Sequence, residues 1–190
     1  MSEASEKVET VENPAPEARG GRIAMLVVAL ALGFAIVPRL VDGFSKPSGT
    51  EDAPDFTVRV VANAESGEQK TLTLSALRGK PVVLDFWATW CGPCQAESPI
   101  VNGIAQRFKD RGVAVVGVNT SDEPGLAERF AAKKGLTFPI VFDEGNKVAR
   151  AYDVDNLPTL VVISKTGKIV AVRHGVTSDS ELDRLVRGVL

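Results

Sequence analysis

The chain has 190 residues, a length that predicts one domain with additional segments. It carries 22 basic and 24 acidic side chains, for a formal net charge of −2, and its basic residues form no long cluster, so we expect no nucleic-acid partner. Its hydrophobic content of 44% is ordinary for a globular protein, but these residues are unevenly distributed along the chain.

The N-terminal segment is polar and is followed by an apolar run. Residues 1–22 include five glutamates and predict a disordered cytoplasmic tail. Ile23 to Val37 contains no polar residue. Residues 23–41 as a helix would measure about 28 Å, close to the thickness of a bilayer core. We therefore expect one transmembrane signal anchor at 23–41.

Two other interpretations of residues 23–41 stay open. A cleaved signal peptide would have an apolar core of similar length, but the long acidic leader and the lack of a clear Ala-x-Ala site favour an uncleaved anchor. A buried helix of the following domain is the second alternative, although segments with Gly and Pro isolate the run on both sides. Arg19 and Arg22 on the N-terminal flank predict a cytoplasmic N-terminus. The rest of the chain would then lie on the periplasmic side of a bacterial cytoplasmic membrane.

A polar linker at 42–53 precedes a domain predicted to span 54–190. There, alternating or continuous apolar residues indicate strands, and a helical period indicates helices. The predicted strands are Phe56–Ala62, Thr71–Leu74, Val82–Trp87, Val113–Asn119, Ile140–Phe142, Thr159–Ile163 and Ile169–Arg173. The predicted helices are Cys94–Lys109, Glu123–Lys134, Asn146–Tyr152 and a last helix that begins after Ser178 or Asp179. Asp122 is the expected N-cap of the second helix and Gly135 its end.

The order of these elements predicts the fold class. Strands that alternate with helices, followed by a hairpin around Ser164–Lys168 and a last helix, indicate an α/β fold with a mixed central sheet flanked by helices. The first two strands are expected to form an N-terminal β-hairpin around the turn Glu65–Glu68.

The only two cysteines, Cys91 and Cys94, lie between the predicted strand Val82–Trp87 and a helix. A helix N-terminus directs unsatisfied N–H groups and partial positive charge at the first sulfur, which stabilises the nucleophilic thiolate. Two intervening residues let the second sulfur attack a mixed disulfide formed by the first. The spacing predicts a redox-active disulfide, with Cys91 as the attacking, more exposed thiol and Cys94 as the resolving thiol.

Other uses of the two cysteines fit the sequence less well. A structural zinc site needs four ligands, whereas the chain has two cysteines and one histidine, His174, so we expect no metal. Haem attachment requires a histidine directly after Cys94, where the sequence has Gln95. A purely structural disulfide is a further alternative, but so short a loop stabilises little.

The residues around the cysteines resemble a known family. The run Val83-Leu84-Asp85-Phe86-Trp87-Ala88-Thr89-Trp90-Cys91-Gly92-Pro93-Cys94 resembles thioredoxin, and Leu157-Pro158-Thr159 resembles the cis-proline loop of that fold. The anchor, Glu97 and Pro99 after the cysteines, and the additional helix at Glu123–Lys134 resemble the membrane-anchored TlpA/ResA/DsbE-like thiol-disulfide oxidoreductases. The resemblance implies an enzyme with a thioredoxin-like fold that has an inserted helix.

The chain departs from this branch in two respects. It has Asp85 where many members carry an amide, and it has Gly-Pro between the cysteines; both features are those of thioredoxin. By the resemblance, this dipeptide accompanies a reducing potential. Thioredoxin's buried lysine partner for its acid has no counterpart on the strand of Val116, Gly117 and Val118.

Two acids are candidate catalytic residues. Asp85 lies in an apolar strand, and a buried carboxyl with a raised pKa would accept the proton of Cys94. The alternative is that Asp85 faces a loop or bonds a backbone amide. Glu97 lies one helical turn beyond Cys94 and would tune Cys94 or contact the substrate; the alternative is an acid that complements the helix dipole.

Four residues are expected to bind the substrate: Trp90, Leu157, Pro158 and Gly175. A cis-proline beside the cysteines would leave a neighbouring backbone edge free to pair with an extended substrate. Trp90 would cover the thiols, and Gly175 matches the thioredoxin loop that approaches the substrate backbone. The alternatives are a packing tryptophan, a proline at a strand start and a turn glycine.

We therefore expect a membrane-tethered thiol-disulfide oxidoreductase that reduces disulfides of extracytoplasmic proteins, for example in cytochrome c maturation. The resemblance implies an integral-membrane thiol electron donor, and because the cysteine pair is the redox centre, no cofactor is expected. The alternatives are a disulfide oxidant, or a copper- or haem-delivery module that uses both cysteines as soft ligands. A thiol peroxidase has only Thr89 in its favour.

Overall fold

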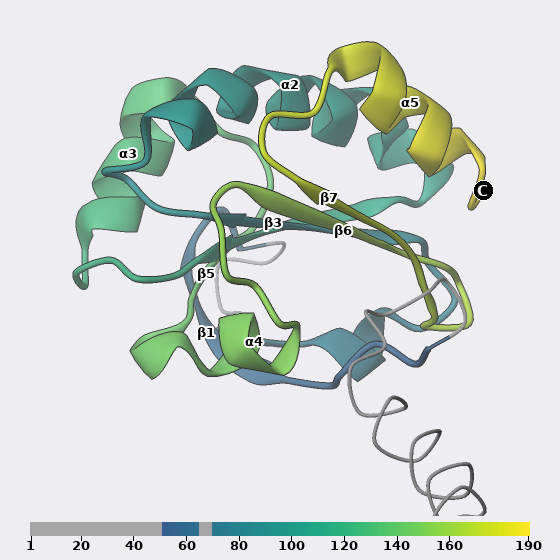
Figure 1. The fold of residues 1–190 in the computed structure, drawn as a ribbon, viewed down its shortest axis with the longest axis horizontal. Helices are drawn as coiled ribbons and strands as arrows, with labels where there is room; N and C mark the ends of the chain where they lie inside the picture. The colour runs from purple at the N-terminus through teal and green to yellow at the C-terminus, as the bar shows by residue number, and fades with distance from the viewer. Residues whose placement is uncertain (1–50, 65–69) are drawn as a thin grey trace, which may run out of the picture. The chain divides into compact units, whose positions relative to one another are not determined.

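The computed structural model describes residues 51–64 and 70–190 (Figure 1). The predicted tail, the predicted anchor at 23–41 and most of the predicted linker lie outside the described residues, as does the predicted turn Glu65–Glu68. Within the two described ranges, no helix combines the length and the apolar character that a bilayer crossing requires.

A seven-stranded mixed sheet forms the centre of the described structure, with the strand order β2-β1-β5-β4-β3-β6-β7. The strands are β1 Thr57–Ala62, β2 Thr71–Thr73, β3 Val82–Trp87, β4 Ala114–Asn119, β5 Ile140–Phe142, β6 Thr159–Ile163 and β7 Ile169–His174. Strands β3, β4 and β5 are parallel, whereas β2, β1, β6 and β7 join them through antiparallel pairs. The long strand β3 therefore lies inside the sheet, with neighbours on both sides.

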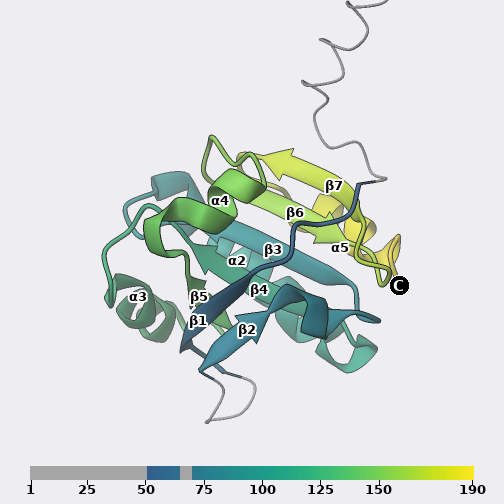
Figure 2. The same ribbon diagram turned by 90° about the horizontal axis from the view of Figure 1, so that it is seen from below.

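Helices cover both faces of this sheet. They are α2 Gly92–Phe108, α3 Leu126–Lys134, α4 Lys147–Ala151 and α5 Asp179–Arg187, with short 3-10 turns at Leu74–Leu77, Lys109–Arg111 and Glu144–Asn146. Figure 1 shows α2, α3 and α5 on one face and α4 on the other, and Figure 2 shows α4 from its own side. The predicted α/β class, the N-terminal hairpin pairing and the inserted helix between β4 and β5 are confirmed.

The main correction concerns the start of the inserted helix. The sequence predicted Asp122 as its N-cap, but α3 begins at Leu126 and its N-cap is Gly125, which has a φ of 81°. A left-handed conformation of this kind is readily adopted by glycine. The carboxylate of Asp122 is therefore not used to cap α3 and binds other groups, as described below. The predicted end at Gly135 is confirmed.

The core forms two layers, one on each face of the sheet. Side chains along a strand point to opposite faces in alternation. In β3, Leu84 and Phe86 belong to the layer on the α4 side, whereas Val83 and Trp87 belong to the layer that includes residues of α2 and α5. The same alternation places Asp85 on the α2 side, beneath the helix that begins just after Cys91.

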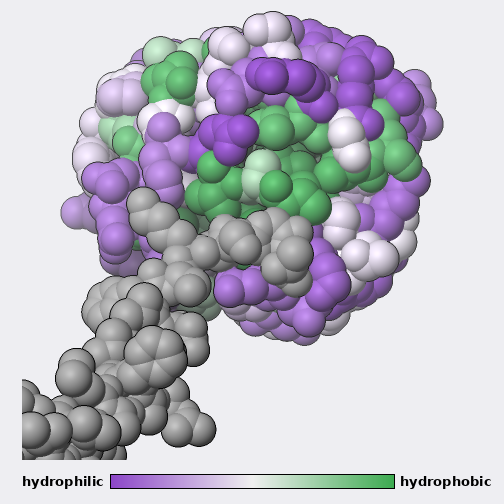
Figure 3. Space-filling model, turned by 45° about the vertical axis from the view of Figure 1, so that its right-hand side comes forward, coloured by the Kyte–Doolittle hydropathy of each residue, from purple (hydrophilic) through white to green (hydrophobic). Residues whose placement is uncertain are grey.

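Some apolar residues reach the surface of the described structure. Figure 3 shows a face on which an apolar area is bordered by hydrophilic residues. Among the large apolar side chains that the structure describes, three are exposed: Trp90, Val170 and Val176. Trp90 is the most exposed of the three, at 64%, and it directly precedes Cys91.

Candidate active site

The two cysteines form a disulfide at the start of α2. Their Cα atoms are 5.3 Å apart, and Cys91 is the N-cap of the helix, with its sulfur 3.2 Å from the backbone N of Cys94. This geometry exposes the sulfur of Cys91 to the N–H groups and positive end of the helix, which favour a thiolate after reduction. Both cysteines are 4% exposed. The two residues thus do not differ in exposed fraction in this disulfide form, since both pack into the core layer on the α2 side, and the greater exposure of the Cys91 thiol stays a prediction.

The predicted substrate-binding residues Pro158 and Gly175 lie side by side. The Leu157–Pro158 peptide bond is cis, as the resemblance implied, and Gly175 has a φ of 78°. The backbone N–H of Gly175 donates to the carbonyl oxygen of Pro158 at 2.8 Å. Thr159, the residue after Pro158, pairs with Phe86 near the end of β3. This register places the cis-proline loop at the end of the sheet from which the chain continues to Cys91.

Trp90 and Leu157 line one hollow of about 420 Å³. Its other lining residues are mostly polar: Thr120, Ser121, Asn146, Ala149, Arg150, Val154, Asp155 and Asn156. The indole N–H of Trp90 donates to the carbonyl oxygen of Ser121 at 2.8 Å, so this exposed ring is held in one orientation. The hollow thus lies between the residue before the cysteine pair and the residue before the cis-proline.

Asp85 is a buried carboxyl beneath the cysteine-bearing helix. It is 5% exposed and lies between Gly117 of β4 and Leu160 of β6. Among the described residues, its Oδ1 atom has no hydrogen-bond partner. Burial raises the pKa of Asp85 well above its usual range, and the negative charge of Glu97 raises it further. A raised pKa makes the carboxylate a stronger base, which favours acceptance of a proton from a thiol.

Glu97 is also buried, although the two acids differ in their partners. It is 1% exposed, and its Oε1 atom accepts a hydrogen bond of 2.7 Å from the backbone N–H of Thr177. Its Oε2 atom has no partner among the described residues. Burial raises the pKa of Glu97, and the hydrogen bond from Thr177 partly opposes this. Glu97 therefore joins α2 to the loop that leads from Gly175 to α5.

Sequence reasoning missed the residues that hold the segment before Cys91. The carboxylate of Asp122 accepts hydrogen bonds from the backbone N–H and the hydroxyl of Thr89, at 2.7 and 2.9 Å. Gln95 donates from its amide to the carbonyl oxygen of Thr89 at 2.8 Å. The contacts of Asp122 join residues 33 positions apart, so only the fold brings them together.

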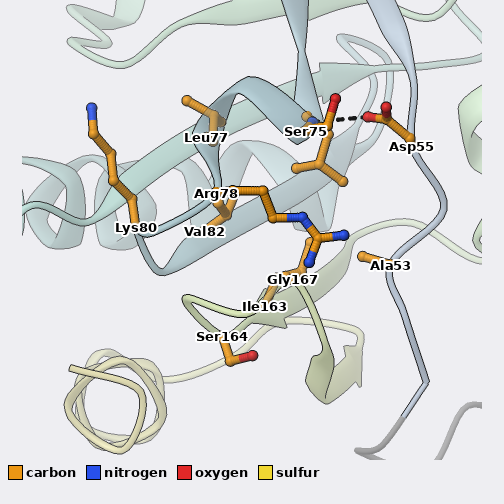
Figure 4. A pocket seen from close by; sticks show the side chains of 11 residues that line it. Ala53, Asp55, Ser75, Leu77, Arg78, Lys80, Val82, Ile163, Ser164 and Gly167 are labelled. Atoms are coloured by element: carbon orange, nitrogen blue, oxygen red, sulfur yellow. Dashed lines mark hydrogen bonds between the residues drawn. The ribbon is translucent and has the colours of Figure 1, made fainter.

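A second, small cavity lies away from the cysteines (Figure 4). It measures about 20 Å³ and is lined by residues that include Val82, Asp55 and Ser75, whose backbone N–H donates to the Asp55 carboxylate at 2.8 Å. Val82 is the first residue of β3, whereas the cysteines follow the last. The cavity is therefore at the opposite end of the strand and is separate from the candidate active site.

Three features together define a thioredoxin-fold thiol-disulfide oxidoreductase. They are a disulfide at the N-terminus of the helix that follows the central strand, a cis-proline loop beside the end of that strand, and a buried acid beneath the helix. Residues 50–172 match the AhpC/TSA family. The chain belongs to this family.

Named relatives agree with this class. The chain is 37% identical over 156 residues to thiol-disulfide oxidoreductase ResA of Bacillus subtilis (strain 168), covering 82% of this chain and 84% of the relative. It is 35% identical over 169 residues to ResA of Geobacillus kaustophilus (strain HTA426), covering 88% and 94%. A crystal structure assigned as thiol:disulfide interchange protein DsbE from Chlorobium tepidum has a TM-score of 0.67 and 30% identity, covering 75% and 97%. The chain is a thiol-disulfide oxidoreductase of the ResA and DsbE type.

Proposed function

We propose that this enzyme is tethered to the bacterial cytoplasmic membrane and reduces disulfides of extracytoplasmic proteins. The observation that carries the proposal is the Cys91–Cys94 disulfide at the start of α2, with the buried carboxyl of Asp85, whose Oδ1 atom has no partner among the described residues, on the same side of the sheet. The Gly-Pro dipeptide between the cysteines supports the reducing direction, through its resemblance to thioredoxin.

The reaction uses the reduced form of the pair. The Cys91 thiolate attacks one sulfur of the client disulfide, forms a mixed disulfide and releases the first client thiolate. The Cys94 thiolate then attacks the sulfur of Cys91, closes the disulfide seen in the structure and releases the second client thiolate. Two electrons pass to the client, and each released thiolate takes up a proton.

Asp85 is the proposed proton acceptor for Cys94. Cys94 lies within the first turn of α2 and must lose its proton before it attacks the mixed disulfide. The raised pKa of the Asp85 carboxyl matches this task, and its Oδ1 atom is free of competing hydrogen bonds from the described residues. Glu97 tunes this step, because its charge favours the protonated form of Asp85.

Client binding is assigned to the surface around the disulfide. The backbone next to the cis-proline, at Leu157, would pair with an extended client segment, and the side chains of Trp90 and Leu157 would contact that segment through the hollow that they line. A ring held by Ser121 loses little conformational freedom on binding.

Membrane attachment rests on the sequence. Residues 23–41 would anchor the protein, with residues 1–22 in the cytoplasm and the domain at 54–190 on the periplasmic side. The TlpA/ResA/DsbE-like resemblance supports apocytochrome c or copper-site proteins as clients and an integral-membrane thiol protein as the electron donor. An oxidising compartment outside the cytoplasm would require such a donor to keep the pair reduced.

Trapping of mixed disulfides tests the proposed function. In membranes, Cys94→Ser should accumulate disulfide-linked clients, because the resolving thiol is missing, whereas Cys91→Ser should trap none. The reduced wild-type protein should reduce insulin. Client trapping by Cys91→Ser instead, or faster alkylation of Cys94 than of Cys91, would reverse the assigned roles. Binding of copper(I) without any disulfide reduction would favour a metal-delivery module.

A further inference from the structure

The segment between β3 and α2 is held by contacts from outside itself. Thr89 and Trp90 belong to neither a strand nor a helix. Backbone groups in such a segment need partners elsewhere. The N–H and hydroxyl of Thr89 donate to Asp122, its carbonyl oxygen accepts from Gln95, and the indole N–H of Trp90 donates to the carbonyl oxygen of Ser121. The loop after β4 therefore supplies three of the four hydrogen bonds.

The carboxylate of Asp122 binds four donors. Its Oδ2 atom accepts from the backbone N of Thr89 at 2.7 Å and from the Asn119 amide at 3.0 Å. Its Oδ1 atom accepts from the Thr89 hydroxyl at 2.9 Å and from the backbone N of Glu123 at 3.0 Å. Burial alone would raise the pKa of Asp122, but the hydrogen bonds from Asn119, Thr89 and Glu123 outweigh burial and lower it. The side chain is consequently an anion at neutral pH.

These contacts differ from those of a helix cap. The N-cap of α3 is Gly125, and Asp122 makes no contact that completes the first turn of that helix. Two of its four bonds fix its own loop, through Asn119 and Glu123. The other two reach Thr89, two residues before the attacking cysteine.

We propose that Asp122 is a positioning residue for disulfide exchange, which holds Thr89 and thereby fixes the sulfur of Cys91 at the start of α2. The inference rests on the proposed function of Cys91. Few contacts separate Asp122 from Cys91. Thr89 is also bound by Gln95 of α2, and Ser121, the neighbour of Asp122, orients Trp90. Attack on a disulfide requires close alignment of the sulfur atoms, so displacement of this segment slows the reaction.

The test compares single variants of the full-length chain, and one double variant, in detergent micelles. Asp122→Ala removes all four accepted hydrogen bonds, Asp122→Asn keeps one oxygen acceptor, and Thr89→Val removes only the hydroxyl. The control is Asp110→Asn, which changes an exposed acid of the Lys109–Arg111 turn. The measurements are the rate of insulin reduction and the thermal unfolding midpoint of each variant.

We expect Asp122→Ala to lower the rate about tenfold and Thr89→Val to lower it about threefold. Asp122→Asn should restore part of the loss, and the control should match the wild type. Because Asp122 acts through Thr89, adding Thr89→Val to Asp122→Ala should cause no further loss. These ratios are measured below the unfolding midpoint of every variant. If Asp122→Ala does not fold, Thr89→Val and Asp122→Asn still give the comparison.

A second measurement separates the effect of Asp122 on the position of the Cys91 sulfur from the effect of its negative charge. Alkylation of Cys91 by iodoacetamide is followed against pH in a Cys94→Ser background. Loss of alignment with the helix N-terminus should move the profile of Asp122→Ala to higher pH, because the thiolate is less stabilised. Simple loss of a nearby negative charge would move it to lower pH.

Three results would overturn the inference: wild-type rates in folded Asp122→Ala or Thr89→Val, a rate loss equal to the fraction unfolded, or an alkylation profile that stays in place or moves to lower pH. Failure of the wild type itself to reduce insulin is a different result, and it would overturn the proposed function first.

Discussion

Replacing Asp85 with asparagine is expected to slow disulfide exchange and to stabilise the oxidised protein as the pH rises. The amide keeps the shape of the carboxyl but cannot accept the proton of Cys94. Because general acid–base catalysis contributes about 10²-fold or more, we expect at least about a tenfold slower reduction of insulin, with Glu97 limiting the loss. The stability change follows from the burial of the carboxyl of Asp85, a residue that is 5% exposed and whose Oδ1 atom has no partner among the described residues.

The sign of the stability change depends on pH. The pKa of Asp85 is raised in the folded protein, so the folded state binds the proton more tightly than the unfolded state. Below about pH 3.9, the pKa of an aspartate in the unfolded chain, Asp85 does not change the stability of the wild type with pH. Above it, the free energy of unfolding falls by about 1.4 kcal/mol per pH unit until the pH passes the pKa of Asp85 in the folded protein. The asparagine variant lacks this loss. Its stability advantage over the wild type should therefore grow by about 1.4 kcal/mol per pH unit across that window, because the amide has no charge to bury.

Urea unfolding of both oxidised proteins between pH 4 and pH 9 measures this gain. Asp143→Asn is the matched control, because Asp143 is 2% exposed but its carboxylate accepts hydrogen bonds of 2.9 Å from the backbone N–H groups of Val148 and Ala149. The free energy of unfolding of Asp143→Asn should fall by about 1–3 kcal/mol, because the amide keeps only one of the two acceptor oxygens. A stability difference between Asp85→Asn and wild type that does not change with pH, or an unchanged rate and pH profile of insulin reduction, would refute the assignment of Asp85.

Three further predictions follow from the site and the sequence. Glu97→Gln should shift the pH dependence of insulin reduction to lower pH, because the charge of Glu97 raises the pKa of Asp85; an unchanged midpoint would show that the acids are not coupled. Trp90→Ala should lower the rate with protein disulfides more than with a small disulfide, since the exposed ring lines the hollow, and equal losses would exclude a client-binding role. Protease added to intact spheroplasts should digest the domain at 54–190, whereas a soluble mature protein beginning near residue 40 would establish a cleaved signal peptide.

The sequence predicts much of the fold because several elements have strong local signals. The run Val82–Trp87, apolar except for Asp85, forms β3 with the predicted bounds, and the cysteines lie at its junction with α2. Asp85 was identifiable for a related reason, since a single acid in an apolar strand is conspicuous. The family resemblance, and not any local pattern, indicated the cis bond before Pro158.

The contacts that complete the site could not be predicted in this way. Glu97 binds the backbone of Thr177, 80 residues away, and Asp122 binds Thr89 across 33 residues. An acid shortly before a helical pattern has the local signature of an N-cap. In the fold, α3 begins later, after its N-cap Gly125, and the Asp122 carboxylate binds Thr89 in the segment before Cys91 instead. Which partner a side chain such as Asp122 binds depends on which strands become neighbours in the sheet, and helix-capping rules carry no information about strand order.

The reduction potential of the Cys91–Cys94 pair tests the central claim most directly. It is obtained by equilibrating the purified protein with glutathione or dithiothreitol buffers and quantifying the reduced fraction by thiol alkylation. A client-reducing enzyme with Gly-Pro between its cysteines should have a potential near that of thioredoxin, about −270 mV. A value near that of DsbA, about −120 mV, would contradict the account and make the protein a disulfide oxidant.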